Sequence, residues 1–165
     1  MLRFVQRRVV RPLMDLLRIG ATPERLAWSI AAGVLIGVNP VLGSTTVLAL
    51  AVASVFRLNY IASQLGNHLM YPVQLLLLPV WIALGSRLFG TPGLRMGRHE
   101  IMLEVKHHPW QTTKALWTWE WHALIVWVFF AAILMPLLVM AFKPVLEKML
   151  VALHHEPVVE KSERQ

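Results

Sequence analysis

Residues 26–56 read LAWSIAAGVLIGVNPVLGSTTVLALAVASVF and include no Asp, Glu, Lys or Arg. The segment NPVLG at 39–43 divides this stretch into two apolar arms of 13 residues each. Because a helix rises about 1.5 Å per residue, such an arm is too short for a hydrocarbon core about 30 Å thick. The stretch therefore predicts a re-entrant helical hairpin that dips into a membrane and turns at 39–43. A single broken spanning helix is the alternative.

A second uncharged stretch, residues 58–86, repeats this design. Pro72 divides it, while Arg57 and Arg87 close the first and the second unit. Transporters place interrupted helices in matching halves around a central site, although prolines are also common in ordinary transmembrane helices. We therefore predict a second broken hairpin, and the two units indicate a weak internal duplication.

The first hairpin has a helix-start signal in front of it. Thr22 can cap the helix, Pro23 suits its first position, and the charge of Glu24 complements the positive end of the helix dipole. We expect a helix to begin here and to continue into the apolar arm.

The segments on either side of the core, residues 22–90, differ from it in character. Residues 1–21 place apolar side chains and arginines at helical spacing, which predicts an amphipathic helix in the headgroup layer or, alternatively, a frayed tail. Residues 91–121 form a tryptophan-rich connector typical of a membrane interface. Residues 122–142 predict one conventional transmembrane helix, and residues 143–165 a polar tail. The predicted fold class is an all-α integral membrane protein.

The overall composition supports this class. Of the 165 residues 56% are hydrophobic and 15% charged, against about 25% charged in soluble domains. The net charge is +7, and six of the sixteen basic residues lie within the first 25 positions. This placement fits the positive-inside rule and attraction to anionic lipid better than a nucleic-acid partner. The chain has no cysteine, so thiol chemistry is excluded.

The two hairpins also predict a topology. Two hairpins, or two broken spans, both return the chain to its starting side, so Arg87 should share a side with the N-terminal arginines. This agrees with positive-inside bias. One hairpin plus one span is disfavoured, since it would place the basic residues after Arg87 on the opposite side. The last helix then takes the C-terminus across.

Polar side chains inside the apolar stretches are the candidate binding residues, because polar groups in a membrane are costly and often functional. The alternative is that the asparagines bond backbone groups freed by proline or glycine, and that the arginines snorkel to the interface. A second set can serve turns and close helix packing. The lipid-binding candidates are Asn39, Arg57, Asn59, Asn67, Gln74 and Arg87, and the turn and packing candidates are Gly33, Gly37, Pro40, Gly43 and Pro72.

Catalytic chemistry has no recognisable residue pattern here. The seven histidines have no metal-binding spacing, and no serine elbow, phosphate-binding loop or dinucleotide fingerprint occurs. We therefore expect no catalytic residue, no metal and no cofactor, and a protein that is not an enzyme.

The first turn also carries a family resemblance. Residues 33–43, GVLIGVNPVLG, resemble the G-x-x-x-G-x-x-P-x-x-G turn of a bacterial membrane family catalogued as domain of unknown function 2062. Residues 56–59 resemble its arginine–x–asparagine step. Residues 67–72, NHLMYP, resemble its N-P-x-T-x-P motif, with His68 and Met70 in place of proline and threonine. The resemblance covers about residues 22–90.

This resemblance implies a multi-pass protein of the bacterial inner membrane, and the N-terminal arginines place its N-terminus in the cytoplasm. Relatives are sometimes fused to glycosyltransferases of the cell envelope, but the resemblance implies no activity. Our leading hypothesis is that a polar notch between the broken helices binds or helps to move a lipid phosphate or envelope precursor. The alternative is a scaffold subunit of an envelope-biogenesis complex, in which Gly33 and Gly37 pack on a partner protein or a second copy.

Overall fold

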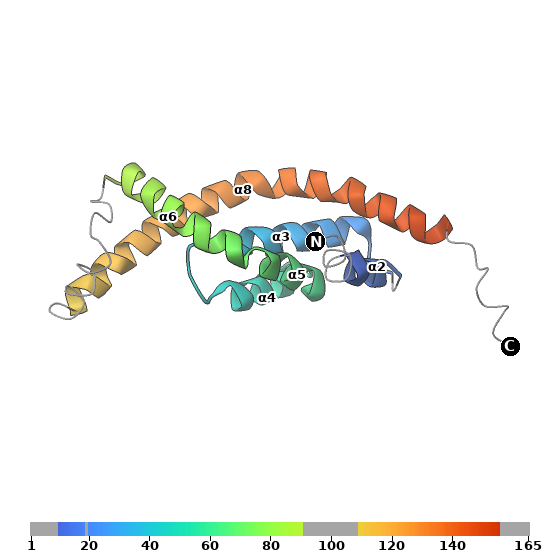
Figure 1. The fold of residues 1–165 in the computed structure, drawn as a ribbon, viewed down its shortest axis with the longest axis horizontal. Helices are drawn as coiled ribbons and strands as arrows, with labels where there is room; N and C mark the ends of the chain where they lie inside the picture. Colours follow the sequence, from blue (N-terminus) through green and yellow to red (C-terminus); the bar gives the residue numbers. More distant parts are fainter. Residues whose placement is uncertain (1–9, 19, 91–108, 156–165) are drawn as a thin grey trace.

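The computed structural model describes residues 10–18, 20–90 and 109–155, and every regular element within these ranges is a helix (Figure 1). The predicted all-α class is therefore confirmed for the described residues. The helices are α2 (Arg11–Arg18), α3 (Pro23–Gly37), α4 (Thr45–Val55), α5 (Tyr60–Leu69), α6 (Tyr71–Leu88) and α8 (Pro109–His155).

Helix α3 begins where its sequence signal lies. Thr22 has extended backbone geometry, and its side-chain oxygen accepts a hydrogen bond from the backbone N–H of Arg25 at 3.3 Å. Pro23 occupies the first turn, together with Glu24. A side-chain cap of this kind satisfies one of the N–H groups that a helix start leaves open.

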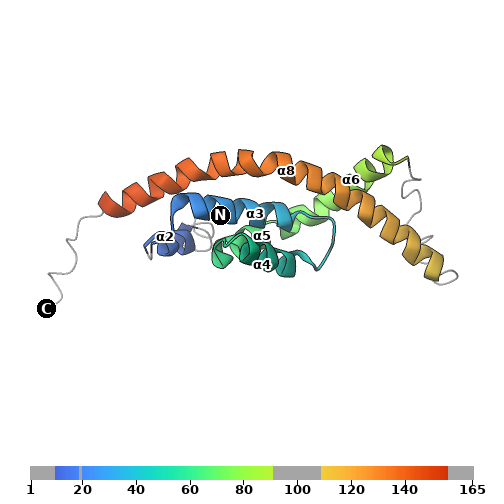
Figure 2. The same ribbon diagram turned by 180° about the vertical axis from the view of Figure 1, so that it is seen from behind.

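After α3 the chain reverses, and α4 returns alongside it (Figures 1 and 2). The side-chain oxygen of Asn39 accepts the N–H of Val41 at 2.7 Å, which closes the first part of the turn. Pro40 is buried there, and Gly43 adopts a φ of 81°, a left-handed conformation that glycine adopts without steric cost. The five-residue interruption is thus a tight structural turn.

Helix α5 runs parallel to α3 and packs closely against it. Gly33 and Gly37 allow this approach: a Cβ at Gly33 would collide with the carbonyl oxygen of Ser63, and one at Gly37 would lie 2.8 Å from the carbonyl oxygen of Asn67. Gly33 thus faces Ser63 and Gly37 faces Asn67, so each contact joins residues thirty positions apart in the sequence. The two glycines therefore pack within the chain.

The second unit differs from the predicted hairpin. Helix α6 follows α5 directly after Met70, does not fold back on it, and packs along α8 instead (Figure 1). The reason is local: Pro72 lies in the first turn of α6, where a missing N–H costs nothing. Met70 is right-handed, so this junction has no left-handed residue comparable to Gly43.

The last helix is much longer than the predicted span of 122–142. Helix α8 continues for 47 residues, with Pro136 and Pro144 inside it, and passes α6, α3 and α2 as one bowed rod (Figure 1). Residues 109–121, predicted as part of an interfacial connector, belong to this helix, while 91–108 lie outside the described residues. Two described helical segments, Tyr71–Leu88 and Trp117–Ala152, are long and apolar enough to cross a membrane.

Helix α2 is amphipathic, but its apolar side faces protein. Leu13, Leu16 and Leu17 are buried in a cluster with residues of α3 and α8, including Leu26 and Leu146. The charged side chains of the helix, Arg11, Asp15 and Arg18, are exposed. The predicted position in the headgroup layer is therefore not needed to cover these leucines. Residues 1–9 of the predicted segment lie outside the described residues.

The contacts along α8 show how far apart the two ends of the molecule lie. Near one end, Gly85 packs against His122, so Arg87 lies close by. Near the other end, Lys143 pairs with Glu24 at 3.6 Å. The intervening helix is about 30 Å long. Arg87 and Arg25, at the start of α3, are thus at opposite ends, and the C-terminal part of α8 lies beside α2. The predicted topology, in which Arg87 shares a side with the N-terminal arginines, does not match this arrangement.

Candidate functional site

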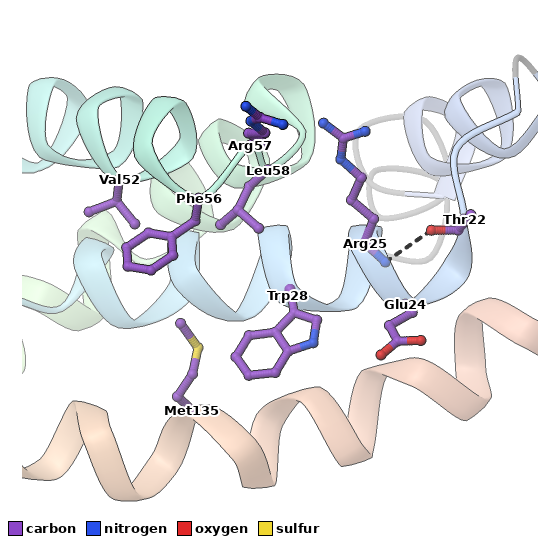
Figure 3. Close-up of a pocket in the computed structure, with 9 residues that line it drawn as sticks. All are labelled: Thr22, Glu24, Arg25, Trp28, Val52, Phe56, Arg57, Leu58 and Met135. Atoms are coloured by element: carbon purple, nitrogen blue, oxygen red, sulfur yellow. Dashed lines mark hydrogen bonds between the residues drawn. The ribbon is translucent and has the colours of Figure 1, made fainter.

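A cleft of about 860 Å³ opens between α3, the end of α4 and α8 (Figure 3). We call it the arginine cleft. Its volume is that of a typical ligand pocket, about 300–1,000 Å³. The residues that line it are Thr22, Glu24, Arg25, Trp28, Val52, Phe56, Arg57, Leu58 and Met135.

The arginine cleft combines an apolar wall with two cationic side chains. Trp28, Phe56 and Met135 supply an apolar wall between α3, α4 and α8, whereas the side chains of Arg25 and Arg57 both extend toward the side of α3 that faces away from α8 (Figure 3). Such a cleft presents hydrocarbon surface and positive charge to the same ligand.

Neither guanidinium is neutralised by a carboxylate within the described ranges 10–18, 20–90 and 109–155. The acid nearest to them along α3, Glu24, pairs with Lys143 at 3.6 Å. Both Arg25 and Arg57 are exposed at the cleft. The cleft therefore keeps two hydrogen-bonding cations that an anionic ligand can reach.

The backbone of Arg57 is held in an unusual conformation. Its φ is 53°, and it is the one non-glycine residue with a positive φ among those described. The N–H of Leu58 donates to the carbonyl of Ala53 at 2.8 Å and that of Arg57 to Ser54 at 3.4 Å, the bond pattern of a Schellman motif. Glycine is the usual residue at this position. The motif fixes an arginine, at some conformational cost, on the rim of the cleft.

A smaller pocket of about 320 Å³ adjoins the arginine cleft and shares Thr22, Arg25 and Leu58 with it. We call it the Asn59 pocket. Because α3 and α5 are parallel and begin at the same end, the first turns of both helices border it. The remaining lining residues are Gly20, Ala21, Asn59, Tyr60 and Ile61.

Asn59, one of the predicted binding residues, has a structural role in this pocket. Its side-chain oxygen accepts the N–H of Ala62 at 3.0 Å and so caps α5. Its own N–H donates to the hydroxyl of Ser29 at 2.8 Å, which ties the start of α5 to α3. The side-chain nitrogen of Asn59 has no partner in the described part of the chain.

The other predicted amides lie in the interior. The side-chain nitrogen of Gln74 donates to the carbonyl oxygen of Asn39 at 2.9 Å, so the structure brings these two residues together. Asn67 donates to Gln64 at 3.3 Å. Asn39 and Asn67 are completely buried, and one side-chain atom of each, Nδ2 and Oδ1 respectively, has no partner among the described residues. The fully buried asparagines thus form no open notch.

The predicted binding residues therefore separate into four places. Arg57 and Asn59 lie at the two adjoining pockets and Asn39 and Gln74 at the buried turn. Asn67 lies in the α3–α5 contact, and Arg87 at the far end of α6. Arg25 is not among the predicted binding residues, since the sequence analysis counts it only with the basic residues near the N-terminus. The signal for it is that Arg25 is the third residue of a helix whose start is fixed by the Thr22 cap.

Two tryptophans were also missed. The indole N–H of Trp81 donates to the carbonyl of Val38, and that of Trp127 to the carbonyl of Leu35, both at 2.9 Å. They add buried donors to carbonyls at the end of α3, of which that of Leu35 also accepts the N–H of Val38 at 3.3 Å. The available signal was their place in the middle of apolar stretches, since membrane tryptophans concentrate at the interfaces.

Comparison with protein families identifies the class of this chain. Residues 6–153 match the model of a family described as an uncharacterized protein conserved in bacteria, domain of unknown function 2062. The chain belongs to this family, as the turn motif at 33–43 indicates, and the match extends well beyond residues 22–90. Searches among curated proteins and among solved structures find no match.

Proposed function

We propose that the arginine cleft binds a phosphate-bearing amphiphile of the bacterial inner membrane, without catalysing a reaction, and so presents it or helps to move it. One observation carries this proposal: Arg25 and Arg57 offer two guanidinium groups at the rim of an apolar cleft, and neither has a carboxylate partner among the residues that the structure describes. The phosphate would lie between them, and the hydrocarbon chain would follow the wall.

Arginine suits this role because its planar guanidinium donates paired hydrogen bonds to phosphate oxygens. The starts of α3 and α5 add a second attraction, since helix N-termini carry partial positive charge and open N–H groups. These contributions act on the phosphate together. Glu24 opposes them only weakly, because Lys143 pairs with it.

The wall of the cleft suits the other part of an amphiphile. Phe56 is 69% exposed and Trp28 39% exposed, so large apolar surfaces face the cleft opening. A hydrocarbon chain can pack against these surfaces, which gives it van der Waals contact with the protein. A soluble phosphate compound without a chain would leave this surface uncovered.

The proposal moves the lipid site away from the buried amides. The side chain of Gln74 donates to the backbone carbonyl of Asn39, and the α3–α5 contact encloses Asn67. The scaffold alternative relied on Gly33 and Gly37, and α5 of the same chain occupies both. No described contact therefore favours that alternative over lipid binding.

The test compares lipids retained by the purified chain in mild detergent. Native mass spectrometry would measure the ratio of bound phosphatidic acid to bound phosphatidylcholine for the wild type, Arg25→Gln and Arg57→Gly. The glycine variant removes the guanidinium while keeping the left-handed backbone favourable. Lys114→Gln removes the same charge from an exposed position near the other end of α8 and is the matched control.

We expect the wild type to prefer phosphatidic acid, and each arginine variant to reduce this preference about tenfold, the scale of one lost charged hydrogen bond. Lys114→Gln should leave it unchanged. An equal loss of preference in all three variants would show that only the net charge of the protein matters, and it would contradict binding at the arginine cleft.

A further inference from the structure

The Asn59 pocket is a second cavity beside the phosphate site. It shares Arg25 with the arginine cleft, so a phosphate bound at Arg25 would have one pocket on each side. The hydrocarbon chain needs only the arginine cleft. A group esterified to the other side of the phosphate would enter the Asn59 pocket, whose volume of about 320 Å³ is enough for a small ligand group.

We infer that the ligand is a phosphodiester lipid with a small, neutral, hydroxylated headgroup, and that the Asn59 pocket selects this headgroup. The inference rests on the proposed phosphate site at Arg25. It adds a specificity that the phosphate site alone does not have, because a lipid with a terminal phosphate would leave the Asn59 pocket empty.

The hydrogen-bonding groups of the pocket determine the type of headgroup. The side-chain oxygen of Asn59 is used in capping Ala62, so the amide offers its N–H groups. The hydroxyl of Thr22 accepts from Arg25, which leaves its own hydrogen available for donation. These two side chains and the guanidinium of Arg25 all present donors. A hydroxyl oxygen on the ligand can accept from them.

An ammonium headgroup fits this pocket poorly. It has donors only, and the positive guanidinium of Arg25 would lie beside it. Among the described residues that line the Asn59 pocket there is no carboxylate; Glu24 lines the arginine cleft and pairs with Lys143. The pocket therefore disfavours ethanolamine and choline and favours an uncharged diol such as glycerol.

The experiment again measures lipid retained by the full chain in mild detergent, now with phosphatidylglycerol, phosphatidylethanolamine and phosphatidic acid of identical acyl chains. Asn59→Ser keeps a residue that caps helices well while removing the amide donor. Ile61→Trp fills the pocket from an exposed position and leaves the cap intact. Thermal unfolding of both variants monitors their folded state.

We expect phosphatidylglycerol to be preferred about fivefold over the other two lipids, the scale of one neutral hydrogen bond. Both variants should lose this preference and retain the wild-type affinity for phosphatidic acid. Equal binding of phosphatidylglycerol and phosphatidic acid by the wild type, or a preference that survives both variants, would overturn the inference while leaving the phosphate site intact. Absence of any preference for phosphatidic acid over phosphatidylcholine in the first experiment would instead remove the phosphate site itself.

Discussion

At the scale of single residues, Arg57 joins backbone conformation to the candidate site. Its left-handed φ of 53° belongs to a helix end where glycine is the common residue. A β-carbon at such a position costs about 1–2 kcal/mol. The same residue places a guanidinium on the rim of the arginine cleft. Substitutions of Arg57 can therefore change the stability of the protein and its ligand binding in opposite directions.

We predict that Arg57→Gly raises the free energy of unfolding by about 1 kcal/mol, because the left-handed conformation no longer meets a side-chain clash. Arg57→Ala is the control, since it removes the guanidinium but keeps the β-carbon. Thermal unfolding in detergent would measure both. A glycine variant less stable than the alanine variant would contradict the role assigned to the backbone.

At the scale of elements, two contacts hold α3: its glycine face against α5 and its carboxyl end against two indoles. The first contact is set by backbone proximity. Gly33 faces the backbone of Ser63 directly, whereas Gly43 has open space where a β-carbon would be. The same substitution at the two sites therefore tests steric and conformational effects separately.

Gly33→Ala should destabilise the protein by about 3 kcal/mol or more, since two helix backbones would have to separate. Gly43→Ala should cost only about 1 kcal/mol, from its positive φ. The midpoints of chemical unfolding of the two variants would give this comparison. Equal costs would show that α3 and α5 do not approach as closely as described.

The second contact concerns the indole N–H of Trp127. In Trp127→Phe the carbonyl of Leu35 loses the indole donor but keeps the N–H of Val38, and we expect a cost of about 0.5–1.5 kcal/mol. Trp121→Phe, at a half-exposed position on the same helix, is the control and should change stability little. The measurement is again unfolding in detergent. A similar cost at both positions would assign the effect to ring size alone.

At the scale of the whole molecule, α8 separates two charged ends. Arg87 lies near His122 and Glu24 pairs with Lys143, which corresponds to about 30 Å of helix, close to the thickness of a hydrocarbon core. The 36-residue apolar segment Trp117–Ala152 is about 54 Å long, so it must tilt or extend beyond the hydrocarbon.

We therefore expect the ends of α4 and α8 to be exposed on one face of the membrane and the end of α6 on the other. The chain has no cysteine, so single cysteines can be introduced directly. Ser54→Cys and Lys148→Cys should react with an impermeant maleimide from the same side, and Leu88→Cys from the opposite side. Labelling of all three from one side would exclude this arrangement.

The pattern of the sequence was sufficient for several features of the fold. The uncharged stretches predicted apolar helices. The segment Thr22-Pro23-Glu24 predicted the start of α3, and the turn motif indicated the family. These features are local: each depends on residues within a few positions of one another. The second hairpin was wrongly predicted because Pro72 starts α6 and no left-handed residue comparable to Gly43 lies at this junction; a proline alone starts a helix as readily as it ends one.

Only the tertiary structure decided which distant residues meet. Arg25 and Arg57 line one cleft because α3 and the end of α4 lie together, and α3 encloses Asn67 of α5 because Gly33 and Gly37 have no side chains. Residue spacing contains no information about the partner helix or its register. The sequence by itself thus determined the helical, apolar class and the family, and packing between helices determined where the candidate site lies.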